Sequence, residues 1–149
     1  MATRHNISDA FKVASLMQVA TSAELQPWVC TVYFVADDDF SLYWLSWPER
    51  RHSREIAKND KVAIAIAVKH DQPVIGIQAE GRAEVVRDGK IVEEILPKYV
   101  KKYGAGKDFI ERFKAGDNEH QLYKFTPSKI VLFDEKNNPP EKARQEMEL

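Results

Sequence analysis

Cysteine is almost absent from this chain, long hydrophobic runs are missing, and neither sign of charge is in excess. Cys30 is the single cysteine, which excludes an internal disulfide and is typical of a reducing compartment. No apolar run approaches the roughly 20 residues that a membrane helix needs. Residues 1–6 lack the apolar core of a secretory signal. We therefore expect a cytoplasmic protein that does not enter a membrane.

The balance of charge narrows the classes of partner. The chain has 22 basic and 23 acidic side chains, a formal net charge of -1. No basic excess is present to neutralise a phosphate backbone, so we expect no nucleic-acid partner. The four histidines show no metal-ligand spacing, and we expect no metal site. No pattern of nucleophile, base and acid indicates a hydrolase, so the sequence identifies no catalytic residue.

The length of 149 residues and a hydrophobic content of 44% suit one domain with one core. No internal repeat or linker is visible, and we expect a single domain over residues 1–149. Beyond Asp134 the sequence becomes charged and contains Pro139 and Pro140. We expect residues 135–149 to form a charged, mobile tail or to wrap a partner.

Period-two patterns and β-branched or aromatic composition predict several strands. The predicted strands cover residues 19–22, 28–36, 40–45, 62–68, 74–87, 121–126 and 129–133. The clearest is the fourth, in which large residues alternate with alanines, as in a barrel strand with one crowded and one narrow face. Asp37–Asp39 is expected to form the tight turn of a hairpin between the second and third.

Helical periodicity predicts helices at residues 7–17, 48–59, 90–103 and 108–114. Pro97 is expected to kink the third helix or to begin a second turn. Consecutive antiparallel strands with helices between them and at the ends predict a mainly β, α+β fold. We expect an antiparallel barrel with peripheral helices rather than a parallel sheet.

The most informative segment is residues 46–54, Ser-Trp-Pro-Glu-Arg-Arg-His-Ser-Arg, between a predicted strand and a predicted helix. A helix start presents unpaired N–H groups and a positive dipole end, so it attracts anions. Several cations at the same end oppose that dipole unless an anion joins them. The pattern therefore indicates a phosphate site.

A second interpretation of this segment needs no ligand. Ser46 and Glu49 fit a capping box, and the arginines fit a solvated face. Spacing alone does not decide between the two interpretations.

Six segments of the chain together resemble the pyridoxamine 5′-phosphate oxidase-like family. They are residues 26–35 (QPWVCTVYFV), 40–46 (FSLYWLS), 51–53 (RHS), 56–62 (IAKNDKV), 78–85 (QAEGRAEV) and 123–130 (YKFTPSKI). The resemblance extends over residues 7–134 with almost no gaps. It implies an antiparallel split β-barrel that forms a homodimer, with two FMN sites at the subunit interface.

The resemblance also implies roles for individual residues. The strand after Pro27 lies along the isoalloxazine ring in this family, which implies such a position for Cys30, Thr31 and Val32. A strand residue at Gly76 or Gln78 is implied at the polar edge of the ring.

At the other end of the cofactor, the resemblance places Leu45 and Ser46 near the flavin and its phosphate. It makes Arg51 and His52 the pair that grips the phosphate. A bidentate arginine fork and a serine hydroxyl suit that ligand, and a histidine donates more strongly when protonated.

Several positions depart from the true oxidases, which carry an arginine where this chain has Cys30. They have lysines where Val35 and His52 stand, and a basic substrate motif where this tail is acidic. We therefore do not expect classical pyridoxamine phosphate oxidase activity. From its residue type alone, Cys30 is expected to pack as a small hydrophobe.

Three hypotheses remain at this point. The first is an FMN-dependent oxidoreductase for a small organic substrate, in which the cofactor performs the redox chemistry. The second is a non-catalytic protein that binds or sequesters a flavin or another phosphorylated ligand. The third is a split barrel that holds haem or a deazaflavin. Trp28, Trp44 and Trp47 are expected in the core or a dimer interface rather than stacked on a flavin.

Overall fold

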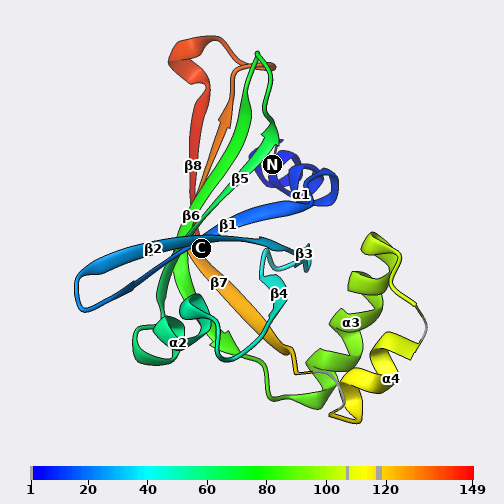
Figure 1. The fold of residues 1–149 in the computed structure, drawn as a ribbon. Coiled ribbons are helices and arrows are strands. Elements are labelled where there is room, and N and C mark those ends of the chain that lie inside the picture. Colours follow the sequence, from blue (N-terminus) through cyan, green and yellow to red (C-terminus); the bar gives the residue numbers. More distant parts are fainter. Residues whose placement is uncertain (1, 107, 117–118) are drawn as a thin grey trace.

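The computed structural model describes residues 2–106, 108–116 and 119–149. Within them, eight strands form one antiparallel sheet in the order β2-β1-β5-β6-β7-β4-β3, and β8 pairs with β7 (Figure 1). The strands are β1 (Leu16–Ala23), β2 (Gln26–Tyr33), β3 (Val35–Ala36), β4 (Leu42–Ser46), β5 (Lys61–Lys69), β6 (Ile75–Val85), β7 (Gln121–Asp134) and β8 (Arg144–Glu148). The helices are α1 (Ala2–Val13), α2 (Arg51–Lys58), α3 (Gly89–Tyr103), α4 (Asp108–Lys114) and the 3-10 helix η1 (Pro140–Lys142).

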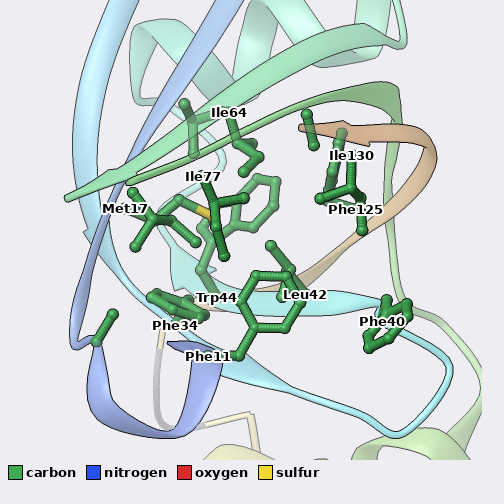
Figure 2. Close-up of a cluster of buried hydrophobic side chains, with 14 of the residues drawn as sticks. Phe11, Met17, Phe34, Phe40, Leu42, Trp44, Ile64, Ile77, Phe125 and Ile130 are labelled. Atoms are coloured by element: carbon green, nitrogen blue, oxygen red, sulfur yellow. The ribbon is translucent and has the colours of Figure 1, made fainter. Parts of the chain in front are cut away.

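The sheet curls around a core of aliphatic and aromatic side chains (Figure 2). In β5 the large residues are buried and the alanines between them are exposed, as the sequence pattern predicts. Phe11 of α1 closes one side of this core through edge-to-face contacts with Phe34 and Phe40, at centroid distances of 6.2 and 6.0 Å. The predicted antiparallel architecture with peripheral helices is confirmed.

The pairing of β2 differs from the predicted hairpin. β2 pairs with β1 across a tight turn in which Glu24 and Leu25 both have positive φ (52° and 65°). The predicted partner, β4, pairs instead with the two residues of β3 on one side and with β7 on the other. The strand breaks at Phe34, whose backbone N–H donates to Ser15 O and the Tyr103 hydroxyl instead of a ladder partner. Among the described strands, β2 therefore has one neighbour and lies at the edge of the sheet.

Two predicted C-terminal strands are one strand in the structure. β7 continues through Pro127 because an irregularity in its ladder with β6 absorbs the residue that cannot donate. The ladder pairs Gly81 with Pro127 and Glu80 with Lys129, so Ser128 is the extra residue. Its hydroxyl donates to Glu80 O, 3.2 Å away.

The helices match their predicted positions with shifts at their ends. α1 ends at Val13, because Met17 belongs to β1 instead. α2 begins at Arg51, three residues after the predicted start, and α4 has its predicted bounds. α3 runs as one helix through Pro97. It packs with α4 on a second apolar cluster built around buried Val35, Tyr43, Ile95 and Leu122.

The expected mobile tail after residue 134 has defined structure. η1 and β8 fold back along β7, and Lys129–Phe133 pair with Arg144–Glu148. The carboxylate of Asp134 starts this reversal by accepting the backbone N–H groups of Lys136 and Asn137, both at 3.0 Å. Composition alone did not predict β8, because this strand forms only by pairing with β7.

Candidate functional site

A buried corner forms where the chain leaves β4 and enters α2. Ser46 Oγ and His52 Nε2 lie 2.7 Å apart and share a hydrogen bond, and both residues are buried. The pKa of His52 is lowered, mainly by burial and to a smaller extent by the nearby charge of Arg50, so the ring is held neutral. The N-cap position of α2 is Arg50 and no side chain caps the helix, so the capping-box interpretation of Ser46 and Glu49 is wrong.

Arg51 lies at the start of α2, one residue before that pair. Its Nε donates to Glu55 Oε2 at 2.8 Å, and its guanidinium lies over the ring of Trp28, 4.2 Å from the centroid. Glu55 Oε1 accepts a hydrogen bond from the hydroxyl of Thr21, also at 2.8 Å. The bonds from Arg51 and Thr21 hold the pKa of Glu55 below its usual value. No hydrogen bond among the described residues uses Nη1 or Nη2 of Arg51.

The three β2 residues predicted beside a flavin divide between the two faces of the sheet. Cys30 and Val32 point inward and pack on the core, whereas Thr31 is exposed on the outer face. Burial raises the pKa of the Cys30 thiol to about 11, so it is not a thiolate nucleophile near neutral pH. This supports the prediction that Cys30 packs as a small hydrophobe.

Thr31 belongs to a row of side chains that crosses the outer face of the sheet. Successive strand pairings connect Thr31 to Gln18, Gln18 to Ala65, Ala65 to Gln78, and Gln78 to Val131. A hollow of about 460 Å³ lies over this region and is lined by alanines together with amide and charged side chains. Gln78 is exposed there, as a ligand-contacting residue must be.

Leu45 does not join either group. It is half-buried and packs on the cluster beneath α3. Within one chain, the structure therefore joins Ser46 to His52 at the corner, directs Arg51 at the start of the same helix toward Glu55 and Trp28, and aligns Thr31 with Gln78 on the outer face.

Sequence reasoning missed Thr21, Glu55 and Gln18. Glu55 had a detectable signal, since it lies four residues after Arg51, the spacing of helical ion pairs. Thr21 and Gln18 had none, because their positions depend on strand pairing.

Among residues 2–106, 108–116 and 119–149, no group of three or more His, Cys, Asp or Glu side chains is arranged to hold a metal. No helix in that part of the chain has the length and apolar character needed to cross a membrane. The helix start with its exposed arginine suits an anion, and the outer hollow suits a ligand with a flat, partly polar surface.

Comparisons with known proteins agree with the fold. The family model described as pyridoxamine 5′-phosphate oxidase matches residues 3–133. The solved structure of general stress protein 26 from Bacillus anthracis str. Sterne is similar with a TM-score of 0.73 and 17% identity, covering 100% of both chains. A FAD-binding protein from Mesorhizobium loti gives a TM-score of 0.63 and 17% identity, over 85% of this chain and 90% of that one.

HutZ, the heme storage protein of Vibrio cholerae, gives a TM-score of 0.66 and 19% identity, over 83% of this chain and 88% of its own. At such identities these structures establish a shared fold, the split β-barrel. A search of curated proteins found no match.

Proposed function

The chain belongs to the pyridoxamine 5′-phosphate oxidase family, and from that premise we propose that it is an FMN-binding, homodimeric oxidoreductase for a small organic substrate. When bound, FMN supplies the redox-active ring, and the protein positions and tunes it. The observation that carries the proposal is Arg51, whose terminal nitrogens have no hydrogen-bond partner among the described residues and lie at a helix start beside the edge strand β2.

The corner supports the phosphate half of the proposal. The side chain of Arg51 is 40% exposed, so an anion can reach Nη1 and Nη2 and bind them as a bidentate fork. The positive end of the α2 dipole adds to the attraction. Ser46 and His52 lie at the same strand-to-helix corner, and a phosphate dianion that reached them would favour the protonated form of His52. The ion pair with Glu55 occupies only Nε, which leaves the fork open.

The edge position of β2 supports the ring half. Half of the backbone groups of an edge strand face away from the sheet and are available to a ligand. Cys30, Thr31 and Val32 lie on this edge. Leu45 lies near the end of β4, the strand that leads to the corner. Thr31 is three residues from Trp28, on which Arg51 rests, so their backbone positions lie about 10 Å apart along this edge at the usual strand rise, with the two side chains on opposite faces. An extended ribityl phosphate spans a distance of this order.

The outer face supports a homodimer, with Gln78 at the polar edge of a ring bound between subunits. Large apolar side chains are exposed on the outer face of the sheet: Leu16 (46%), Val29 (58%), Tyr33 (55%) and Phe133 (37%). Ala63, Ala65 and Ala67 are exposed on β5 in the same sheet and present no bulky side chain. A broad apolar surface with small residues at its centre allows close approach of a second sheet.

The first test is titration of the flavin-free protein with FMN and with riboflavin, which lacks the phosphate. We expect Arg51→Ala to weaken FMN binding at least tenfold, the order of one lost charge-assisted contact, with little effect on riboflavin. Arg112→Ala removes the same charge from α4 and serves as the control. If Arg51→Ala binds FMN as tightly as the unmodified protein, the phosphate assignment is wrong.

The second test concerns the reaction. Anaerobic addition of NADH or NADPH, or of a panel of small reduced organic compounds, should bleach the flavin absorption of the complex. If the protein binds a flavin that none of these compounds reduces, the proposal of an oxidoreductase is wrong and the protein is a flavin-binding or flavin-sequestering protein. A Soret band after addition of haemin, together with no binding of FMN, would show that the cofactor is haem and not FMN.

A further inference from the structure

Glu55 is a buried carboxylate with both oxygens occupied. The residue is 8% exposed, and its two oxygens accept from Arg51 Nε and from the Thr21 hydroxyl, each at 2.8 Å. Thr21 is itself buried (2%) on β1. A charge in such a place is tolerated only when it is paired and hydrogen-bonded. The arrangement therefore forms a continuous chain from β1 through α2 to the guanidinium.

This chain restricts Arg51 from two directions. The bond from Nε to Glu55 fixes one edge of the guanidinium, and the ring of Trp28, whose centroid is 4.2 Å from the guanidinium carbon, restricts its movement on one side. An isolated arginine at a helix start samples many rotamers, and ordering it on binding lowers affinity. Here Glu55 and Trp28 hold the side chain before any ligand arrives, and within the part of the chain that the structure describes the Nη1 and Nη2 edge is left unbonded.

We propose that Glu55 is a positioning residue, which together with Thr21 holds the guanidinium of Arg51 so that its terminal nitrogens face the phosphate of the ligand. The inference rests on the proposed function, since it assumes that Arg51 binds that phosphate. Glu55 itself does not touch the ligand. The lowered pKa of Glu55 supports the proposal, because the carboxylate stays ionised and bonded to Arg51 through the physiological range.

The carboxylate has a second effect that opposes binding. Its negative charge lies near the phosphate site, so removing the charge alone favours the anion, while removing the whole side chain frees Arg51. The two effects are separable by substitution. Glu55→Gln keeps an oxygen for Arg51 Nε and deletes the charge, whereas Glu55→Ala deletes both. Thr21→Val keeps the shape of Thr21 and deletes its hydroxyl.

The experiment measures dissociation constants for FMN and riboflavin at constant pH and salt. We expect Glu55→Ala to weaken FMN about tenfold and to leave riboflavin within about twofold. Glu55→Gln is expected to bind FMN at least as tightly as the unmodified protein, and Thr21→Val about threefold more weakly. Glu49→Ala removes an exposed carboxylate from the turn before α2 and serves as the charge-matched control. It should not weaken FMN binding.

A double-mutant cycle separates positioning from a merely structural role. Once Arg51 is alanine, Glu55→Ala should cost no further FMN affinity, because the residue acts through Arg51. Thermal unfolding of each variant confirms folding, and Thr21→Val and Glu55→Gln decide the matter if Glu55→Ala does not fold.

The outcomes distinguish this inference from the proposed function. If Arg51→Ala weakens FMN but Glu55→Ala binds it as tightly as or more tightly than the unmodified protein, Glu55 competes with the phosphate and the positioning role is wrong. If Arg51→Ala has no effect on FMN binding, the phosphate assignment itself fails.

Discussion

Ser46 Oγ and His52 Nε2 are joined at 2.7 Å across the buried turn between β4 and α2, and this contact fixes the ring of His52 in the first turn of α2. The hydroxyl satisfies one ring nitrogen, so the imidazole is buried without charge. Burial is the main reason that its pKa lies below the usual value.

The neutral state of His52 predicts a loss of stability in mild acid. Below its unfolded pKa near 6.5, the unfolded chain binds a proton that the folded chain does not bind, so the free energy of unfolding falls as pH falls. Each such histidine contributes a slope of at most about 1.4 kcal/mol per pH unit. Urea unfolding between pH 7.5 and 5.5 should show this decline.

Substitution identifies the histidine responsible. His52→Gln, which keeps a partner for Ser46, should flatten the decline in stability. The pKa of His120 is also lowered, mainly by burial, so His120→Gln should remove a separate share. An unchanged slope in His52→Gln would show that His52 is charged in the folded protein.

Gly81 is required by the close approach of β6 and β7. A Cβ atom there would lie 2.1 Å from Thr126 O, whereas a Cβ at Gly76 would meet Ile66 O at an ordinary 3.5 Å. We expect Gly81→Ala to lower the free energy of unfolding by about 2 kcal/mol or more, because backbone must move. Gly76→Ala is the matched control and should change it by less than about 1 kcal/mol. Equal effects in chemical denaturation would contradict this reading.

Lys102 of α3 joins three backbone segments. Its ammonium donates to the carbonyls of Phe11 and Ala14 at the end of α1 and of Phe34 after β2. Burial lowers its pKa to about 8, so it is still charged at pH 7. We expect Lys102→Met to cost about 1–3 kcal/mol at pH 7, since it strips these carbonyls of a partner.

Lys101→Met, on the exposed side of the same helix, is the control for Lys102 and should be nearly neutral. Amide hydrogen exchange should increase selectively in α1 of the Lys102 variant. Stability equal to that of the control would mean that water replaces the ammonium without cost.

Ala65 lies at the middle of the outer row, between Gln18 and Gln78. If a second copy covers this face, Ala65→Arg should give a monomer in sedimentation and weaken FMN binding together with dimerisation. Ala115→Arg, at an exposed position after α4, should leave both unchanged. If the unmodified protein is a monomer in sedimentation, the proposed site shared between two subunits is wrong.

The sequence by itself determined much of the local structure. Alternation of large residues with alanine predicts β5 and its two faces, and periodicity predicts α4 with its observed bounds. The order and spacing of six short segments identifies the family. These signals are local or cumulative along the chain, so they do not depend on which strands become neighbours.

Only the tertiary structure decided which groups meet. β2 pairs with β1 rather than β4, and that choice places Thr21 opposite Trp28 and beneath Arg51. Residues 135–149 read as a charged tail, yet the free edge of β7 accepts part of them as β8. Period-two patterns give a strand its faces but not its neighbours, because strand pairing depends on backbone groups far apart in sequence. The contact of Arg51 with Trp28 and the bond from Thr21 to Glu55 were therefore set by the fold, whereas the Arg51–Glu55 pair follows from helical spacing.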